Sequence, residues 1–349
     1  MSRRAKIGFS RDFLDKDGKF ILPGPGLNLI QGIPNAEIEV FREILPDATP
    51  EQIDGFDIVI SRTNPRWSEK SFVGNDQLLS IHRNGVGYDR IDVPSLTGAG
   101  VMLCITPDAV RRPVAVAIIT FILALSTRLL LKHQLTSAGK WNEVALQHGY
   151  GLVGKTLGSI GVGNIGHEMF MLAKPFGMKH IGCDPYITQE SVADVGVRLV
   201  SFETILTESD FLSISCPLNR ETRGMIGEKE LRKMKKTAFL INTARGPIVD
   251  EKALVSALVE GWIRGAAVDV FTEEPTPPDN PLLKLDNIIV TAHAMVFTNE
   301  YLTKVWEQIH QQITDIIRGE MPNGVVNKEV WGKPGFQTKL KRFLASTKG

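Results

Sequence analysis

The chain has 349 residues, of which 40 are basic and 39 acidic, so its formal net charge at pH 7 is +1. A chain of this length can bury a large core and suits two domains, and balanced charge gives no sign of a nucleic-acid or anionic-membrane surface. Cys104, Cys183 and Cys216 stand far apart, which excludes a disulfide framework or a metal-binding pattern. We expect these thiols to be small buried side chains in a reducing compartment.

The N-terminal segment MSRRAKIGFS contains no apolar run and no cleavage site of a signal peptide, which favours a cytoplasmic protein. The most apolar stretch, residues 114–131, is interrupted by Thr120, Ser126, Thr127 and Arg128. We therefore expect a buried or interface helix there and no membrane span.

Short apolar runs alternate with helical or loop segments over the first hundred residues, which predicts a small parallel sheet. The expected strands lie at residues 6–9, 57–61, 78–82 and 101–105. A long helix from about Ala109 to Leu135 should follow, with Pro107 and Asp108 at its start.

A second set of strand-like runs follows this helix. The expected strands lie at residues 156–160, 180–184, 211–215, 238–242, 266–270 and 288–291. Six strands with intervening helices predict a doubly wound α/β domain. A helix over residues 299–318 and the polar tail could return to the first set. We therefore expect one domain at residues 108–296, inserted into another that is built from residues 1–107 and 297–349.

The segment GVGNIG follows the first expected strand of the inserted domain and has the spacing of a dinucleotide-binding turn. Gly161 permits the tight turn, Gly163 lets the backbone approach a pyrophosphate, and Gly166 lets the helix pack against the strand. The helix N-terminus would then face the phosphates. A bare pattern of this kind also occurs by chance in glycine-rich loops, so the interpretation depends on its context.

Asp184 supplies that context, because it ends the next strand, where a carboxylate can accept hydrogen bonds from an adenosine ribose. This favours NAD over NADP, since a 2′-phosphate would be repelled. The alternative interpretation is a turn-forming acid before Pro185.

Three further segments follow strands of the same domain, where ligands meet open α/β sheets. They are INTARGPIVD with Arg245, GAAVDVFTEEP with Asp269 and Glu274, and VTAHAM with His293. An arginine, a carboxylate and a histidine on separate strand ends would converge on one crevice.

These residue types suit hydride transfer coupled to proton transfer. Imidazole exchanges protons near neutral pH, so His293 is the candidate acid and base. A carboxylate beside the ring favours its charged form and fixes its orientation, which is the role expected of Glu274. Arg245 can hold a substrate carboxylate bidentately and polarise the adjacent carbonyl. Each residue alone could be structural, but the dinucleotide turn favours the functional interpretation.

With these motifs, the chain resembles the D-isomer-specific 2-hydroxyacid dehydrogenase family. The resemblance extends from NGVGYDRID at residues 84–92, through GVGNIG, CDP, PLNRETRGMIG and INTARGPIVD, to AVDVFTEEP and the histidine segment. It implies two doubly wound parallel-sheet domains, a Rossmann NAD-binding domain inserted into a flavodoxin-like substrate domain, and a homodimer. The implied activity is the NAD-dependent interconversion of a D-2-hydroxy acid and its 2-keto acid, with no nucleic acid, membrane or metal as partner.

The resemblance also assigns roles to single residues. Arg245, Glu274 and His293 match the family's catalytic residues, and the backbone N–H groups of Val86 and Gly87 match its seat for the substrate carboxylate, which Arg245 also binds. The positions implied to contact the cofactor are Gly161, Gly163, Asn164, Ile165, Gly166, Asp184, Pro217, Thr222, Thr243 and Asp269. Of these, Thr243 and Asp269 would orient the nicotinamide carboxamide.

Because of two departures from the family pattern, the resemblance does not identify the side chain of the substrate. Val116 stands where the family commonly has a glutamate, and the residues from Ala292 to Phe297 replace a proline and small residues around the histidine. Arg111 and Arg112 at the start of the long helix could receive a phosphate or second carboxylate, or could be solvated or pair across a dimer. The same alternatives, substrate binding or a structural role, apply to Arg62 and Arg83.

Two other function classes remain open. Some relatives with this fold act as NAD-sensing corepressors and keep the same three catalytic residue types. The chain shows no disordered partner-binding tail, which counts against that role. A structural dimer with a vestigial cofactor site is disfavoured because Asp184 and Asp269 are both present.

Overall fold

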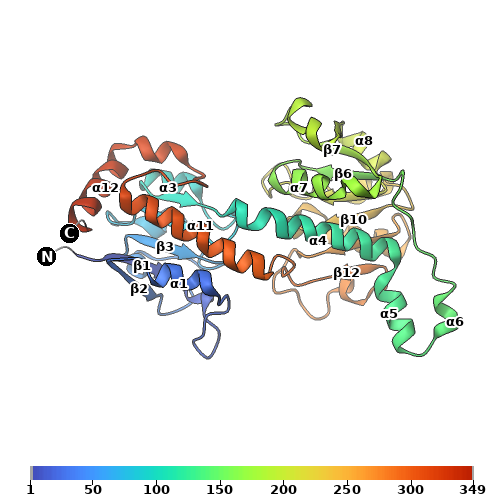
Figure 1. Cartoon of the computed structure of the whole chain (residues 1–349), viewed down its shortest axis with the longest axis horizontal. Coiled ribbons are helices and arrows are strands. Elements are labelled where there is room, and N and C mark those ends of the chain that lie inside the picture. Colours follow the sequence, from blue (N-terminus) through green and yellow to red (C-terminus); the bar gives the residue numbers. More distant parts are fainter. Residues whose placement is uncertain (1–2, 348–349) are drawn as a thin grey trace. The chain divides into compact units, whose positions relative to one another are not determined.

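The computed structural model describes residues 3–347 and divides the chain into two compact units. Unit 1 contains both ends of the chain, up to Val110 and from Thr298, and unit 2 comprises Arg111–Phe297. Unit 2 is therefore an insertion into unit 1, and the two ends of the chain, blue and red in Figure 1, both belong to unit 1.

Unit 1 is built on a five-stranded sheet in which every neighbouring pair is parallel, in the order β2-β1-β3-β4-β5. The strands are β1 (Ala5–Phe9), β2 (Ala36–Val40), β3 (Ile58–Ser61), β4 (Ser80–Arg83) and β5 (Met102–Cys104). This is the flavodoxin-like order, which confirms the expected fold class. The sequence interpretation missed β2, because Glu37 and Glu39 give this exposed edge strand a polar pattern.

The helices of unit 1 come from both ends of the chain. They are α1 (Pro25–Gln31), α2 (Pro50–Ile53), α3 (Val93–Gly98), α11 (Asn299–Arg318) and α12 (Pro334–Thr347). Helix α11 has the predicted bounds and packs closely on α1, where a Cβ atom on Gly26 would lie 2.7 Å from the Cβ of Trp306. The C-terminal part of the chain from Thr298 thus belongs to unit 1.

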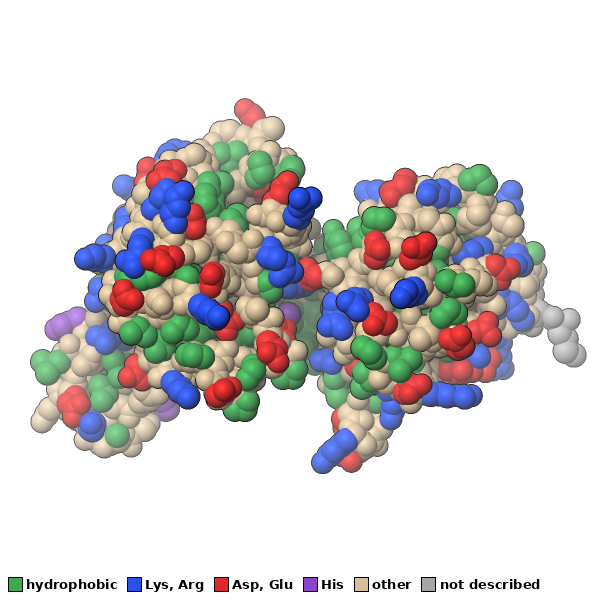
Figure 2. Space-filling model, turned by 180° about the vertical axis from the view of Figure 1, so that it is seen from behind, with side chains coloured by type: hydrophobic (Ala, Val, Ile, Leu, Met, Phe, Trp, Pro, Cys, Tyr) green, Lys and Arg blue, Asp and Glu red, His purple; other side chains and the backbone are tan. Residues whose placement is uncertain are grey.

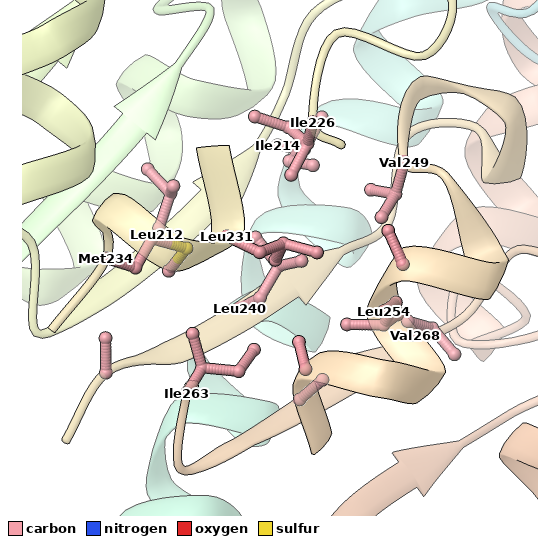
Figure 3. Packing of buried hydrophobic residues seen from close by; sticks show 14 of the residues in the cluster. Leu212, Ile214, Ile226, Leu231, Met234, Leu240, Val249, Leu254, Ile263 and Val268 are labelled. Carbon is pink, nitrogen blue, oxygen red and sulfur yellow. The ribbon is translucent and has the colours of Figure 1, made fainter. Parts of the chain in front are cut away.

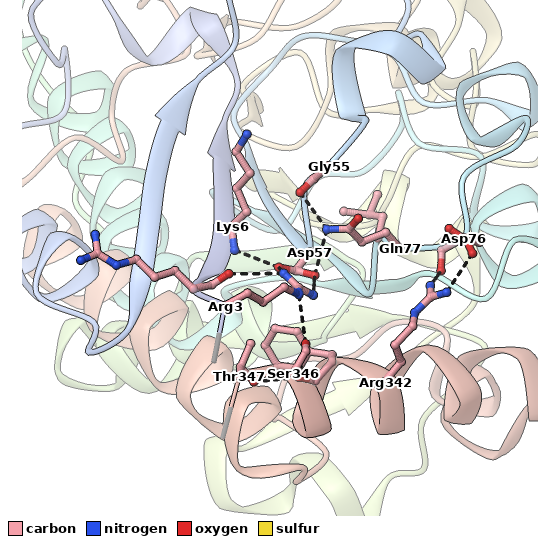
Figure 4. Close-up of polar contacts among 12 residues, drawn as sticks. Arg3, Lys6, Gly55, Asp57, Asp76, Gln77, Arg342, Ser346 and Thr347 are labelled. Atoms are coloured by element: carbon pink, nitrogen blue, oxygen red, sulfur yellow. Dashed lines mark hydrogen bonds and ion pairs between the residues drawn. The ribbon is translucent and has the colours of Figure 1, made fainter. Parts of the chain in front are cut away.

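Two arginines link helix α12 to the rest of unit 1, Arg3 by bridging Ser346 and Asp57 and Arg342 by pairing with Asp76 (Figure 4). The Arg3 guanidinium donates to both carboxylate oxygens of Asp57, at 2.6 and 2.7 Å, and to the Ser346 hydroxyl at 3.0 Å. Arg342 pairs with Asp76 at 2.9 Å. The Asp57 side chain is only 1% exposed, so Arg3 compensates a carboxylate that burial would otherwise destabilise.

Unit 2 contains a seven-stranded, fully parallel sheet in the order β12-β11-β10-β9-β6-β7-β8. The strands are β6 (Thr156–Ile160), β7 (Lys179–Cys183), β8 (Val197–Leu199), β9 (Phe211–Ile214), β10 (Phe239–Asn242), β11 (Gly265–Val268) and β12 (Ile288–Val290). The six expected strands are present, and the expectation of six was short by one. Strand β8 was missed because it is a three-residue edge strand with an exposed arginine at its centre.

Both faces of this sheet are covered by apolar clusters, as a doubly wound fold requires. Because side chains alternate along a strand, Leu212 and Ile214 join the cluster shown in Figure 3, whereas Phe211 joins the cluster on the opposite face. The first cluster is covered by α8 (Phe202–Glu208), α9 (Glu228–Lys233) and α10 (Glu251–Val259), and the second by α4 (Pro107–Thr127) and α7 (Asn164–Ala173).

The expected single helix from Ala109 to Leu135 was wrong in its second half. Helix α4 ends at Thr127, Arg128 takes a left-handed conformation with φ of 56°, and α5 (Leu129–Ser137) and α6 (Trp141–Val144) continue as an arm. The chain returns against the end of α4, where the Tyr150 N–H donates to the Ser126 carbonyl. That tertiary bond takes a carbonyl that a continued helix would use.

Helix α4 is the only helix within residues 3–347 whose length and apolar composition would suit a membrane span. Its apolar residues Ala115, Ile118, Phe121 and Ile122 are buried in the second cluster of unit 2. This is the environment of a core helix, in agreement with the sequence interpretation.

The cysteines differ from the expectation that all three are buried. Cys104 is buried in β5, and burial raises the pKa of its thiol. Cys183 and Cys216 are only partly buried, because they lie where β7 and β9 end and the sheet meets solvent. On the face shown in Figure 2, basic and acidic side chains are interspersed, with no large area of one sign.

Candidate active site

All the residues expected from unit 2 follow the carboxyl ends of its strands. Because the sheet is fully parallel, these ends lie along one edge. In sheet order, the residues are His293 after β12, Asp269 after β11, Thr243 after β10, Pro217 after β9, Gly161 after β6 and Asp184 after β7. The sequence interpretation therefore placed them on the correct edge.

The three glycines of the dinucleotide turn have the surroundings that a bound pyrophosphate needs. Gly161 has φ of 88°, and a Cβ there would lie 2.7 Å from the Ser215 carbonyl oxygen. A Cβ on Gly166 would lie 2.6 Å from the Gly161 carbonyl oxygen, whereas one on Gly163 would meet nothing within 4 Å. Gly161 and Gly166 are thus needed for packing, and Gly163 leaves open space, so the turn fits the dinucleotide.

Helix α7 begins directly at this turn. Gly163 is its N-cap and provides no side-chain acceptor for the first N–H groups, which include those of Asn164 and Ile165. Free N–H groups at a helix start favour an anion through hydrogen bonding and the helix dipole. The local backbone therefore suits a phosphate group.

The Asp184 carboxylate braces the same turn. Its Oδ2 accepts the Val162 N–H at 2.9 Å and its Oδ1 accepts the Tyr186 N–H at 3.0 Å. A carboxylate has about four lone-pair positions, so both oxygens keep capacity for hydroxyl donors. Asp184 thus supports the turn and can still accept from a ribose.

The segment after β9 is held by its own hydrogen bonds. The Thr222 hydroxyl donates to the Pro217 carbonyl at 2.7 Å and accepts the Asn219 N–H at 2.8 Å. Thr222 therefore fixes the loop that carries Pro217. Thr243, directly after β10, is half-buried.

Asp269 holds the loop that presents His293. Its carboxylate accepts the Thr291 hydroxyl at 2.6 Å and the Ala294 N–H at 3.0 Å, and its carbonyl accepts the His293 N–H at 2.7 Å. The Asp269 residue is 5% exposed. The sequence interpretation gave Asp269 only a cofactor role and missed this bracing, which depends on a contact between two different strand ends.

His293 and Glu274 form the central pair of the site. The ring Nδ1 lies 2.8 Å from Glu274 Oε2, and the imidazole side chain is 44% exposed. His293 has φ of 53°, a conformation that a non-glycine residue rarely adopts and that concentrates at functional sites. With Nδ1 facing the carboxylate, Nε2 is the nitrogen left for a reacting group.

The surroundings of Glu274 favour its ionised form. Partial burial is the largest single influence and acts to raise the pKa of Glu274, but it is outweighed. The hydrogen bond with His293, the charge of that ring, the Phe271 N–H at 3.0 Å and the charge of Arg245 together hold the pKa below its usual value. A charged carboxylate is the form that orients and stabilises a protonated imidazole.

Arg245 lies on a loop that packs tightly against the Glu274 loop. Gly246 makes this possible, because a Cβ there would lie 2.0 Å from the Phe271 carbonyl carbon. The Asn242 amide donates to the Arg245 carbonyl at 3.0 Å, and the Arg245 guanidinium donates to the Ala244 carbonyl at 2.7 Å. The structure thus brings the arginine, glutamate and histidine of the sequence interpretation to adjacent strand ends of one unit.

In unit 1, Val86 and Gly87 follow β4 in a half-buried loop. Gly85 has φ of 124° and its N–H donates to the Thr106 hydroxyl at 2.9 Å, while the Gly87 carbonyl accepts from Arg83 at 2.8 Å. Within residues 3–347, the N–H groups of Val86 and Gly87 donate to no protein acceptor. Paired free donors of this kind suit a carboxylate.

The remaining arginines have structural partners. Arg112 pairs with Glu168 of α7 at 2.6 Å, and Arg111 lies 3.7 Å from the same carboxylate. The Arg62 guanidinium donates to the Asp12 carbonyl at 3.2 Å. For Arg111 and Arg112 these contacts favour a structural role over a substrate-binding one.

Residues 119–294 match the family model described as D-isomer specific 2-hydroxyacid dehydrogenase, NAD binding domain. The match spans half of the chain and contains the dinucleotide turn, Asp184 and the catalytic candidates. The chain belongs to this family.

The enzyme is also similar in sequence to curated reductases and dehydrogenases. It is 36% identical over 324 residues to a glyoxylate reductase of Korarchaeum cryptofilum, covering 90% of this chain and 97% of that protein. It is 39% identical over 292 residues to a D-3-phosphoglycerate dehydrogenase of Methanocaldococcus jannaschii, covering 83% of this chain but 55% of that protein.

Among solved structures, the enzyme is similar to the D-lactate dehydrogenase of Aquifex aeolicus in complex with NAD and lactic acid. The TM-score is 0.76 at 25% identity, covering 90% of this chain and 96% of that one. The enzyme is therefore an NAD-dependent D-2-hydroxyacid dehydrogenase, and the expected fold, class and cofactor are confirmed. The roles of single residues, the domain limits, the homodimer and the cytoplasmic location stay predictions.

Proposed function

We propose that the enzyme reduces a small 2-keto acid to the D-2-hydroxy acid, and catalyses the reverse reaction, with His293 as the acid and base. The observation that carries this proposal is the 2.8 Å contact between His293 Nδ1 and Glu274 Oε2. It fixes the ring, keeps a negative charge beside it and directs Nε2 away from the carboxylate.

The reduction needs a hydride and a proton. NADH, when held at the turn from Gly161 to Gly166, would supply the hydride that the carbonyl carbon receives. Protonated His293 gives the proton from Nε2 to the carbonyl oxygen, and ionised Glu274 stabilises the protonated ring before the transfer. In the oxidation direction neutral His293 accepts the hydroxyl proton, and Glu274 stabilises the charge that forms.

The substrate carboxylate is assigned to the N–H groups of Val86 and Gly87 and to Arg245. Arg245 can bind one oxygen of the carboxylate and the carbonyl oxygen with its planar fork, which also draws electron density from the carbon that receives the hydride. The roles of Asp269 and Thr243 towards the nicotinamide carboxamide belong to the same proposal.

The cofactor is assigned to the turn from Gly161 to Gly166, with Asp184 as the acceptor for the ribose hydroxyls. This predicts a preference for NADH over NADPH, because Asp184 would repel a 2′-phosphate. Replacing Asp184 with serine should weaken NADH binding and narrow its advantage over NADPH, measured by fluorescence titration of both. Tighter binding of NADPH than NADH by the wild type would contradict the assignment.

We also propose a homodimer through the arm formed by α5 and α6. No residue of either helix is buried. In and directly after these helices, four large apolar side chains are exposed, namely Leu129, Leu130, Trp141 and Leu146. An arm with this composition suits coverage by a second copy of the chain. Sedimentation of the wild type and of a Trp141→Glu variant tests this, with a dimer expected only for the wild type.

The test of the activity is the consumption of NADH with a panel of 2-keto acids that starts with glyoxylate and includes hydroxypyruvate, pyruvate, phosphohydroxypyruvate and 2-ketoglutarate. We expect turnover of at least one of them. An Arg245→Lys variant should lose mainly substrate affinity, because lysine cannot reproduce the bidentate fork. Tight NADH binding without turnover of any substrate would contradict the proposal and favour a nucleotide-sensing role.

A further inference from the structure

Strand β4 and the residue that follows it carry a row of three buried polar side chains. Ser80, His82 and Asn84 are spaced by two residues, so they face the same side of the sheet, and each is at most 5% exposed. The neighbouring strand β3 is Ile-Val-Ile-Ser and completely buried. Buried polar groups are costly unless they are hydrogen-bonded, so this row has a specific structural requirement.

Hydrogen bonds join Ser80 and His82 to Gln312 of helix α11. His82 Nδ1 lies 3.0 Å from Gln312 Oε1, and His82 Nε2 lies 3.0 Å from the Ser80 hydroxyl. Because an amide oxygen can only accept, Nδ1 is the nitrogen that carries the hydrogen. The Gln312 amide nitrogen donates to the carbonyls of Ile105 and Asn323 at 2.8 and 2.9 Å.

The side chain of Asn84, at the C-terminal end of the row, is held by a single hydrogen bond. The Tyr301 hydroxyl, from the first turn of α11, donates to Asn84 Oδ1 at 2.8 Å. Tyr301 is 2% exposed, and the Asn84 amide nitrogen is a buried donor without a partner in the described residues. The Asn84 side chain is therefore fixed to the helix by the tyrosine alone.

Asn84 is also the residue from which the carboxylate-binding loop departs. Its carbonyl accepts from Arg83 at 2.9 Å, the next residue is Gly85 with positive φ, and the free N–H groups of Val86 and Gly87 follow. A small rotation of Asn84 would redirect both N–H groups. An error of about 1 Å in the position of a binding group is enough to impair a site severely.

We propose that Tyr301 is a positioning residue for substrate binding, which acts through Asn84 to orient the N–H groups of Val86 and Gly87. This inference rests on the proposed function of that loop. It assigns to the start of α11 a role in the affinity for the 2-keto acid and none in binding of the cofactor, because the dinucleotide turn belongs to unit 2.

The experiment is a Tyr301→Phe variant, which removes the hydroxyl and keeps the ring. Loss of one buried hydrogen bond that leaves its partner unsatisfied should raise KM for glyoxylate, or for the best substrate of the panel, by about tenfold. We expect kcat to change far less and the Kd of NADH to stay the same. Trp306→Phe is the matched control, because it also removes a buried hydrogen bond of α11, from the indole N–H to the Leu22 carbonyl.

An Asn84→Ala variant completes the cycle. If the tyrosine acts through the asparagine, the double variant has a KM no higher than that of the worse single variant, whereas independent effects would multiply. The same cycle serves if Tyr301→Phe lowers stability, since folded enzyme can be quantified by its NADH-binding capacity.

The measurements distinguish a failure of the proposed function from a failure of the role proposed for Tyr301. No turnover by the wild type with any 2-keto acid overturns the proposed function and this inference with it. Normal wild-type turnover, with KM unchanged in Tyr301→Phe or raised equally in Trp306→Phe, overturns the inference alone.

Discussion

His82 and His293 lie near the carboxyl ends of strands in different units, and their surroundings are opposite. His82 is 0% exposed, and its ring nitrogens are hydrogen-bonded to the neutral groups of Ser80 and Gln312. Burial lowers the pKa of His82 to about 4, against a smaller effect of the hydrogen bond to Gln312. His293 is 44% exposed and contacts the carboxylate of Glu274.

The difference shows how partners decide what an imidazole does. A buried ring with neutral partners stays neutral over the physiological range, so it can only fix geometry. An exposed ring beside a carboxylate can gain and lose a proton without leaving a buried charge uncompensated. In this enzyme the first kind of histidine belongs to the row that supports the proposed carboxylate-binding loop, and the second kind is the proposed acid and base.

The largest expected effect separates the two histidines by activity. His293→Ala should lower kcat for keto-acid reduction by about 10²- to 10⁴-fold, the usual contribution of a general acid or base, with NADH binding nearly unchanged. His82→Asn should leave kcat nearly unchanged, because asparagine can still donate to Gln312. Comparable losses of kcat in the two variants would remove the distinction.

The second prediction separates them by stability. The unfolded chain protonates His82 near pH 6.5, whereas the folded chain keeps it neutral down to about pH 4. The contribution of His82 to stability is therefore complete above pH 6.5 and is lost as the pH falls towards 4. The free energy of unfolding should fall by on the order of 3 kcal/mol over this interval.

Urea unfolding at several pH values measures this slope. His82→Asn should reduce it, and His133→Asn, on the exposed helix α5, should not. The other titratable group close to His82 is Cys104 on the adjacent strand, with Asp315 near that thiol. An equal slope in the wild type and the His82 variant would assign the pH dependence to other groups.

The smallest predicted effect concerns the carboxylate that distinguishes the surroundings of His293. Glu274→Gln keeps the shape and the hydrogen bond but removes the charge, so kcat for reduction should fall by about tenfold, less than on loss of the ring. Reduction should also fail at a lower pH than in the wild type, because the protonated ring has lost its counter-charge. A variant with the wild-type pH profile would show that Glu274 acts only by orienting the ring.

Much of the unit 2 site could be predicted because its signals are local in the sequence. The surroundings of Gly161, Gly163 and Gly166 follow from the space that each turn position needs. Arg245, Glu274 and His293 follow strands of a parallel sheet, so their common edge is set by topology. Their mutual distances were not predictable, because they depend on close approaches such as that of Gly246 to the Phe271 backbone.

Unit 1 was less predictable for the corresponding reason. The contact of Asn84 with Tyr301 joins residues 217 positions apart, and no local sequence pattern predicts it. The available signal was the polar residue at every second position from Ser80 to Asn84 in an apolar strand. The end of α4 at Thr127 was missed because it is decided by the returning segment at Tyr150, a tertiary effect that overrides helix propensity.

In the proposed reaction, His293 exchanges the substrate proton. The most direct measurement is the pH dependence of kcat/KM for keto-acid reduction in the wild type and in His293→Asn. We expect the wild-type value to fall with rising pH as the ring loses its proton, and the small residual activity of the variant to show no such fall. The same fall in His293→Asn would rule out His293 as the acid, because another group would then supply the proton.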